Sequence, residues 1–305
     1  MTRWFLFTLI AISIVNCSAP EENLQLKDKI VQVLDTVEGD FALAYFNFNT
    51  QEELLINESE PFHAASTMKT PVLIEAYKKA RSGFFGINDS ILLNNEFYSI
   101  VDSSQYFLTR ESDGDPELYD RIGTRIGWRE LMEKMITRSS NLATNVLIRE
   151  LNAIDVTQTM RELGAPSIQV LRGVEDIKAY EAGLSNSTTA YDLLQIFKKI
   201  GLGEAVDSAA SEEMIQIMSR QEFSDIIPAE LPQDVKIAHK TGSITGVRHD
   251  SGIIFLPDGR KYVLVLLSKN LNNEDEGVRA LAKVSKIIYD EVAQNSLPLE
   301  SITNG

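Results

Sequence analysis

The chain has 305 residues, a formal net charge of −15 and 44% hydrophobic residues. This length and apolar content predict a large globular region, built as one composite domain or as two interlocked domains. The sequence contains no basic run that could neutralise phosphates, so its acidic balance excludes a nucleic-acid-binding protein.

The N-terminus has the pattern of an export signal. Met1, Thr2 and Arg3 form a short basic region, and residues 4–15 are nearly all apolar but too few to span a bilayer comfortably. The only cysteine, Cys17, follows directly and cannot form an internal disulfide. We expect Cys17 to carry a lipid at a new N-terminus, as in bacterial lipoproteins. In the alternative, residues 1–19 are an ordinary signal peptide and Cys17 is removed with them.

The elements predicted in chain order begin and end with strands that have helices between them. Apolar spacing and turn residues predict first a helix at 24–34 and a hairpin of strands at 41–48 and 54–56. Helices are then predicted at 128–137, 140–151, 154–163 and 190–200. Three strands follow at 236–240, 252–256 and 261–268, and an amphipathic helix at 278–293 closes the series.

This order predicts an α/β (α+β) fold. An antiparallel sheet flanked by helices would be built from the N- and C-terminal segments and would carry an inserted all-helical domain. We expect residues 24–65 and 205–297 to form the α/β domain and residues 66–204 the helical domain. A site shared by the two would lie in the cleft between them.

Ser66 and Lys69 lie three residues apart at the start of an apolar, helix-compatible run. On one helical turn they would share a face, which is the spacing that a nucleophile and its activating base need. The lysine can accept a proton only if burial or another cation lowers its pKa. The alternative is a serine cap followed by a solvated lysine. Pro71 lacks an N–H group, so we expect the Ser66 turn to be tight or irregular.

Two further motifs have the residues for a polar cleft. In Ser139-Ser140-Asn141, a hydroxyl can relay a proton to a leaving group and an amide can hold the substrate, although a helix cap is the simpler interpretation. Lys240, Thr241 and Gly242 end a predicted strand. The lysine and threonine can bind a carboxylate, and glycine lets a substrate lie close; the alternative is an exposed edge strand.

The three motifs in this order resemble the signature of class A β-lactamases, within the penicillin-recognising serine hydrolases. The resemblance covers residues 24–294. It implies that Ser66 is acylated with help from Lys69, that Ser139 relays a proton and that Asn141 holds the substrate amide. It also implies a carboxylate site at Lys240 and Thr241 and an oxyanion hole formed by the N–H groups of Ser66 and Ser243.

The expected Ω-loop, residues 171–184, departs from the family pattern. The resemblance assigns activation of the deacylating water to Glu175, with Glu181 as the second choice. Class A enzymes usually follow that glutamate with Leu-Asn, whose asparagine also holds the water. This chain has Lys178 and Ala179 there, so deacylation is the step that the sequence supports least.

Two other positions differ from the family. Ser140 stands where class A enzymes usually carry aspartate, which predicts a local effect on stability. Residues 245–252 predict a longer hairpin than is usual, and Arg248 within it either supplies a second cation for the substrate carboxylate or is an exposed turn residue.

The resulting hypothesis is an exported, periplasmic, monomeric serine β-lactamase that acts on a small β-lactam or peptidoglycan-like substrate. His63, His239 and His249 are too poorly spaced for a metal site, and no metal or organic cofactor is implied. Two alternatives stay open. One is a D-Ala-D-Ala carboxypeptidase or related amide hydrolase, and the other is a penicillin-binding or peptidoglycan-sensing module that remains acylated.

Overall fold

The computed structural model describes residues 19–295 of the chain. Cys17 and residues 1–18 of the predicted export signal lie outside the described residues. Among the helices within 19–295, none combines the length and the apolar character needed to cross a membrane.

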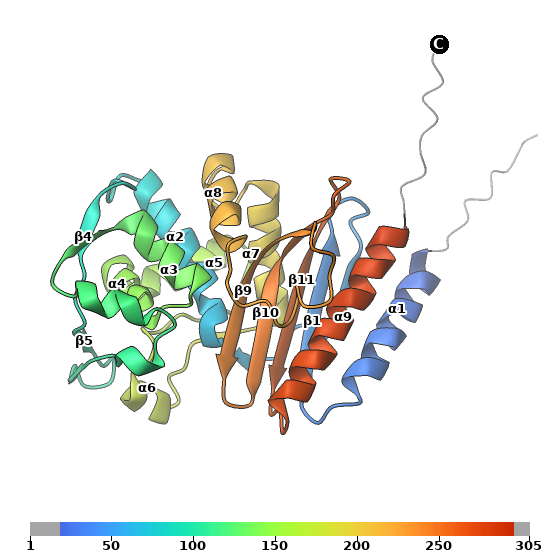
Figure 1. The fold of residues 1–305 in the computed structure, drawn as a ribbon, viewed down its shortest axis with the longest axis horizontal. Helices are drawn as coiled ribbons and strands as arrows, with labels where there is room; N and C mark the ends of the chain where they lie inside the picture. Colours follow the sequence, from blue (N-terminus) through green and yellow to red (C-terminus); the bar gives the residue numbers. More distant parts are fainter. Residues whose placement is uncertain (1–18, 296–305) are drawn as a thin grey trace, which may run out of the picture.

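The centre of the molecule is a five-stranded sheet in the order β2-β1-β11-β10-β9 (Figure 1). All neighbouring strands pair antiparallel, and β1 near the N-terminus pairs with β11 near the C-terminus. The two ends of the chain therefore build one sheet, as predicted. The strands are β1 (Asp40–Asn47), β2 (Glu53–Ile56), β9 (Lys236–Ile244), β10 (Val247–Phe255) and β11 (Lys261–Lys269).

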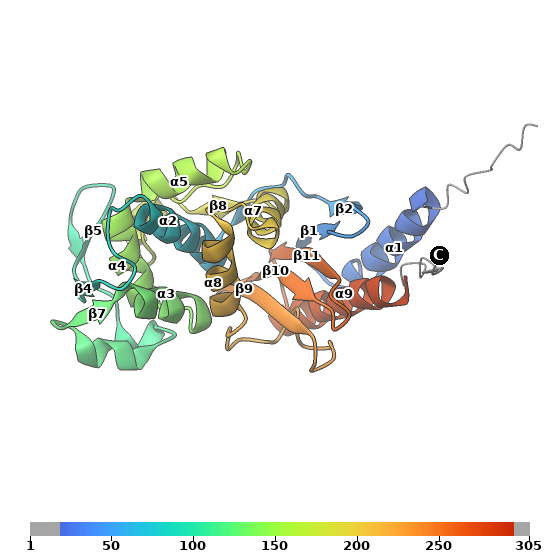
Figure 2. The same ribbon diagram turned by 90° about the horizontal axis from the view of Figure 1, so that it is seen from above.

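Helices cover both faces of this sheet. Helices α1 (Ala19–Leu34) and α9 (Glu274–Gln294) lie side by side on one face (Figures 1 and 2). The other side carries the helices of the inserted region together with α8, which follows it. These helices are α2 (Lys69–Arg81), α3 (Trp128–Thr137), α4 (Asn141–Leu151), α5 (Ala153–Glu162), α6 (Ile177–Glu181), α7 (Ala190–Leu202) and α8 (Ser208–Met218).

The inserted region is not helical throughout, which corrects the expectation of an all-helical domain. It also contains 3-10 helices and short paired strands. These are η1 (Ala65–Met68), η2 (Arg110–Ser112) and η3 (Pro116–Arg121), with β3 (Phe62–His63), β4 (Ser90–Leu92), β5 (Phe97–Tyr98), β6 (Gln105–Tyr106), β7 (Arg125–Gly127) and β8 (Ser187–Thr188), which pairs with β3 just before the region begins. Helix α7, before the domain boundary predicted after residue 204, packs against β1 and β11, and helix α8, after that boundary, packs against β9. Helices on both sides of the predicted boundary therefore contact the sheet.

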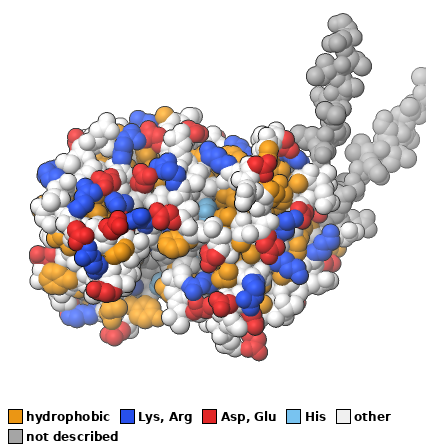
Figure 3. Space-filling model, in the orientation of Figure 1, with side chains coloured by type: hydrophobic (Ala, Val, Ile, Leu, Met, Phe, Trp, Pro, Cys, Tyr) orange, Lys and Arg blue, Asp and Glu red, His pale blue; other side chains and the backbone are white. Residues whose placement is uncertain are grey.

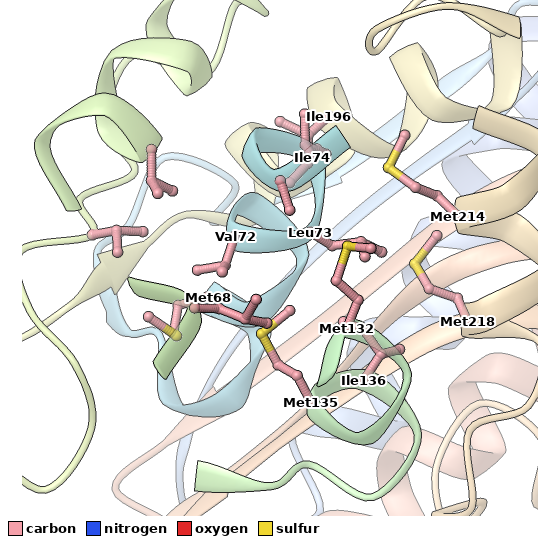
Figure 4. Close-up of a cluster of buried hydrophobic side chains, with 14 of the residues drawn as sticks. Met68, Val72, Leu73, Ile74, Met132, Met135, Ile136, Ile196, Met214 and Met218 are labelled. Atoms are coloured by element: carbon pink, nitrogen blue, oxygen red, sulfur yellow. The ribbon is translucent and has the colours of Figure 1, made fainter. Parts of the chain in front are cut away.

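Two apolar cores explain why the strands are buried on both sides. Along β1, Ala42, Ala44 and Phe46 belong to the core shared with the inserted helices, whereas Leu43 and Tyr45 belong to the core beneath α1 and α9. This alternation follows from the two-residue period of a strand. Helix α2 runs through the first core, where its apolar residues pack among methionines of α3 and α8 (Figure 4).

The hairpin after β9 is shorter than predicted. Ile244 pairs with Val247, so Thr245 and Gly246 alone form the turn, and Gly246 has a φ of 71°. The residues expected to extend the hairpin continue as β10 instead, because their backbone groups pair with β9. Helices α6 and α8 were not predicted.

Leu43→Ala is expected to lower the free energy of unfolding by about 2–5 kcal/mol, because its side chain is fully buried beneath α1 and α9. Leu24→Ala is the matched control, since Leu24 is 60% exposed on α1. Thermal unfolding followed by circular dichroism measures both variants. Equal midpoints for the two would contradict the second core.

Candidate active site

Ser66 lies on a 3-10 turn that immediately precedes the buried helix α2. Ala65, directly before it, has a left-handed φ of 44°, and its N–H donates to Nδ1 of His63 at 3.0 Å. The irregular turn predicted from Pro71 is confirmed, because the α-helix begins only at Lys69. Pro71 then falls in the first helical turn, where an N–H group has no partner within the helix.

Lys69 places its amine at the centre of the polar cluster. Its side chain is fully buried, and Nζ donates to Ser139 O at 2.7 Å, Ser139 Oγ at 3.0 Å and Asn141 Oδ1 at 3.0 Å. Burial lowers the pKa of Lys69 well below its usual value, and the charge of Lys240 lowers it further, while Asp113 and Glu175 act in the opposite direction. A lysine in this environment can accept a proton.

Ser139 joins two lysines. Its Oγ accepts from Lys240 Nζ at 3.2 Å as well as from Lys69, and its backbone has a left-handed φ of 57°. The next residue, Ser140, is buried and caps α4 by accepting from Ala143 N. The carboxylate near this helix start comes from Asp113, which accepts from Leu142 N at 2.7 Å. Asp113 thus supplies a negative group where the middle motif residue has none.

Lys240 and Gly242 bring strand β9 against the nucleophile turn. Lys240 is fully buried, and burial lowers its pKa to about 7 despite the opposing charge of Asp250. A Cβ atom at Gly242 would lie 3.2 Å from Thr67 N and 3.3 Å from the Cβ of Ala65. Glycine at this position therefore allows the strand to approach the residues on both sides of Ser66.

Glu175 faces Asn141 across the site. Asn141 Nδ2 donates to Glu175 Oε1 at 2.8 Å, and Ser112 Oγ lies 3.4 Å from the same oxygen. The backbone just before it is fixed by Asn145, which accepts from Val174 N at 2.6 Å and donates to Val174 O at 3.0 Å. These contacts join the loop to α4 and place one carboxylate beside the motif residues.

The other loop residues considered for this role lie elsewhere. Glu181 is exposed and does not line the cavity at Ser66. Ala179 is fully buried, and its N–H donates to Asp176 Oδ1 at 3.1 Å. The structure therefore brings Glu175, and not Glu181, to Asn141, and it offers no side-chain amide at residue 179.

Arg248 is not brought to the other candidates. Its guanidinium forms an ion pair with Glu274 at the start of α9, at 2.5 Å, and it does not line the cavity. Glu274 also accepts from Gly246 N at 2.7 Å, so this carboxylate fixes both the arginine and the turn.

A cavity of about 380 Å³ opens at Ser66, between the inserted region and the edge of the sheet. The surface is visibly hollowed between these two parts in Figure 3. The cavity residues come from the nucleophile turn, α4, the loop around Glu175 and the end of β9: His63, Ala65, Ser66, Asn141, Arg172, Val174, Glu175, Asp176, Ile177, Tyr180, Asn186, Ser243, Ile244 and Thr245. A wider, more open cavity of about 930 Å³ lies around Arg125 and Trp128, away from the three motifs.

His249 supports the nucleophile turn and was not predicted to do so. It is fully buried on β10, where Nδ1 accepts from Ser268 N at 3.1 Å and Nε2 donates to His63 O at 2.9 Å. Burial lowers its pKa to about 4, so the ring is neutral at neutral pH and can accept at Nδ1 while it donates from Nε2. The only sequence signal for this role of His249 was its position opposite Gly242 in the β9–β10 register. That position could be recognised only once the correct strand pairing was known.

Within residues 19–295, no three His, Cys, Asp or Glu side chains lie together in a way that could hold a metal ion.

A family model described as the beta-lactamase enzyme family matches residues 25–292. The chain belongs to this family. A beta-lactamase of Bacillus licheniformis is 22% identical over 291 residues, covering 92% of the chain and 89% of the relative. Among solved structures, PBP-A is 26% identical with a TM-score of 0.76, covering 88% of the chain and 96% of PBP-A. A PBP-A mutant solved as an acyl-enzyme complex with penicillin G gives 26% identity and a TM-score of 0.75, covering 89% and 97%.

The match confirms the predicted beta-lactamase family, its fold class and its hydrolase class. In this member of the family, Gly242→Ala is expected to slow acylation at least tenfold, because the added methyl group displaces the backbone beside Ser66. Gly127→Ala is the control, since a Cβ atom there meets nothing within 4 Å and φ is −66°. Intact-protein mass spectrometry against time measures both variants. Unchanged acylation in Gly242→Ala would contradict the close approach.

Lys240→Met is expected to stabilise the protein at neutral pH while abolishing activity. The pKa of Lys240 is near its usual 10.5 when unfolded and about 7 when folded, so the unfolded state binds more protons between these values. The stability of the parent therefore rises with pH across this window. The shift corresponds to about 4 kcal/mol at pH 7, which the two lost hydrogen bonds of Lys240 partly offset, and the gain should vanish towards pH 10.5.

Unfolding midpoints at pH 7 and pH 10 test this expectation, with the exposed Lys236→Met on the same strand as the control. A variant at position 240 that is less stable than the parent at both pH values would show that its hydrogen bonds outweigh the cost of burying the amine.

Proposed function

We propose that the chain is a serine β-lactamase that opens the lactam amide through an acyl-enzyme on Ser66. The observation that supports this most is the buried amine of Lys69. It lies one helical turn after Ser66 and contacts both Ser139 and Asn141. The proposal also agrees with the acylation of a structural neighbour, the PBP-A mutant, by penicillin G.

In the acylation step, Ser66 Oγ attacks the lactam carbonyl carbon as it loses its proton. The lowered pKa of Lys69 suits it to accept that proton, directly or through a water activated by Glu175. The N–H groups of Ser66 and Ser243 stabilise the oxyanion. Collapse of the intermediate breaks the C–N bond, and Ser139, which is bonded to Lys69, delivers a proton to the nitrogen.

Substrate placement uses groups on both sides of Ser66. Lys240 and Thr241 bind the carboxylate on the leaving-group side, and Lys240 also polarises the hydroxyl of Ser139 through their contact of 3.2 Å. Asn141 holds the acyl-side amide. Arg248 has no part in this scheme, because Glu274 already neutralises its charge.

Deacylation depends on Glu175, which removes a proton from the water that attacks the acyl carbonyl. The hydrogen bond from Asn141 fixes one carboxylate oxygen, and Ser112 lies near the same atom. Ala179 offers no side-chain amide to hold this water. This favours the two alternatives in which deacylation of a β-lactam adduct is slower: a D-Ala-D-Ala peptidase and a module that remains acylated. All three share the acylation step and differ in how fast Ser66 is released.

We also propose that the protein is exported as a monomer and that Cys17 carries a lipid. The predicted export signal supports export, and the position of Cys17 directly after its apolar run supports the lipid. The mass of the N-terminal peptide from the membrane fraction tests the lipid, and an unmodified N-terminus at Pro20 would exclude it.

Glu175→Gln is expected to acylate with a β-lactam but to deacylate at least about 100-fold more slowly, because the general base is lost. The acyl adduct should persist in intact-mass spectra, and Ser66→Ala should give none. Glu181→Gln supplies the comparison: if Glu181 were the base, the two variants would exchange behaviour. A parental protein that gives one stoichiometric burst with a chromogenic cephalosporin and then stalls would contradict the β-lactamase proposal.

A further inference from the structure

One end of the active-site cavity has no part in the reaction described above. This end is formed by His63, Tyr180 and Arg172, which lie near one another, whereas Lys240 and Thr241 are absent from the cavity lining. A substrate that is bonded to Ser66 and directs its leaving-group carboxylate to Lys240 therefore extends its acyl side chain towards this end.

Arg172 is a buried cation without a paired carboxylate. Its side chain is 7% exposed, with Nε donating to Leu184 O and Nη1 donating to Gly173 O, both at 2.9 Å. Within the described part of the chain, no carboxylate lies within 4.0 Å of its guanidinium, and Nη2 has no hydrogen-bond partner. Nη2 is also not among the fully buried side-chain atoms that lack a partner, and Arg172 lines the cavity. A guanidinium this deeply buried gains from an anion.

His63 presents a second donor at the same end. Its Nδ1 accepts from Ala65 N, which requires the ring proton to lie on Nε2. Burial lowers the pKa of His63, and the nearby charge of Arg172 lowers it further, so the ring stays neutral. Nε2 has no partner among residues 19–295, although His63 lines the cavity.

Tyr180 adds a third donor. Its ring lies edge-on to His63 with centroids 6.3 Å apart, and its hydroxyl has no partner within the described residues. Three residues that line the cavity, among them the half-exposed Tyr180, thus carry an N–H or O–H group without an acceptor in the described part of the chain.

The neighbouring acids do not use these donors. Asp176 accepts from Ile100 N at 3.0 Å and from Ala179 N at 3.1 Å, and its charge acts on Arg172 only from beyond ion-pair distance. Glu175 accepts a hydrogen bond from Asn141 and lies beyond ion-pair distance of Arg172. The free donors therefore remain available to a ligand.

We propose that Arg172, His63 and Tyr180 form a subsite for a carboxylate on the acyl side of the substrate. This inference rests on the proposed acylation of Ser66 and specifies its substrate class. Two sources share the chemistry: a β-lactam whose acylamino side chain carries a carboxylate, and a peptide whose acyl portion carries one. The guanidinium and the two neutral donors match a carboxylate's two oxygens.

The test compares substrates that differ by this one group. Benzylpenicillin and its α-carboxy derivative form the lactam pair, and D-Ala-D-Ala peptides with a carboxylate or a carboxamide in the acyl portion form the peptide pair. In the parental protein, acylation kcat/KM should favour the acid over its neutral partner at least about tenfold in one pair, and added salt should reduce this preference. The pair that shows the preference identifies the source.

Arg172→Gln should remove most of the preference while the neutral substrate still acylates Ser66, and Tyr180→Phe, which removes one hydroxyl only, should reduce it about threefold. Arg220→Gln, at an arginine remote from the cavity, should leave the preference unchanged. Tyr180→Phe keeps the test decisive if Arg172→Gln fails to fold.

The two proposals fail in different ways. If neutral and acidic substrates acylate Ser66 equally well, or if the preference survives both site variants, the subsite is wrong and the β-lactamase proposal stands. If no substrate of either pair acylates Ser66, the proposed function is wrong and the subsite falls with it.

Discussion

The buried amine of Lys69 is the constraint on which the site depends. Removing a lysine from water raises the free energy of its charged form, and Lys240 nearby raises it again. The surrounding oxygens of Ser139 and Asn141 give the amine three partners, so it is held in one place without a full counter-charge. A buried amine of this kind keeps its position only if the surrounding backbone is held firmly by packing. The rest of the fold provides that packing.

This packing arises from two cores that meet at one sheet. One core carries η1 with Ser66 and α2 with Lys69, while β9 carries Lys240 and Gly242 on the edge of the sheet. The two elements touch because Gly242 has no side chain. His249 then ties β10, the strand next to β9, to His63, two residues before the turn that carries Ser66. Reactive groups from distant parts of the sequence are thus fixed to one another through packed backbone rather than through flexible loops.

Much of the fold was predictable because both sheet halves follow the two-residue period and both end helices follow the helical period. The helix 128–137 was predicted to the residue, and the motifs at Ser66, Ser139 and Lys240 were brought together as expected. The hairpin after β9 was not predictable, because residues 247–252 read as a turn until their strand pairing is known. The roles of Asp113, Asn145 and His249 also escaped prediction, since each acts through a backbone group that is distant in sequence.

The loop around Glu175 shows how neutral groups free a charge for other use. Asn145 holds both backbone groups of Val174, and Asn186 accepts from Leu171 N and Arg172 N while donating to Arg172 O. An amide can donate and accept at once, so two asparagines fix both ends of this turn without adding charge. The loop is thereby fixed without a carboxylate within ion-pair distance of Arg172. Because neutral amides and backbone carbonyls make these contacts, the guanidinium of Arg172 stays an unpaired cation in the wall of the cavity, which is the property that the proposed carboxylate subsite uses.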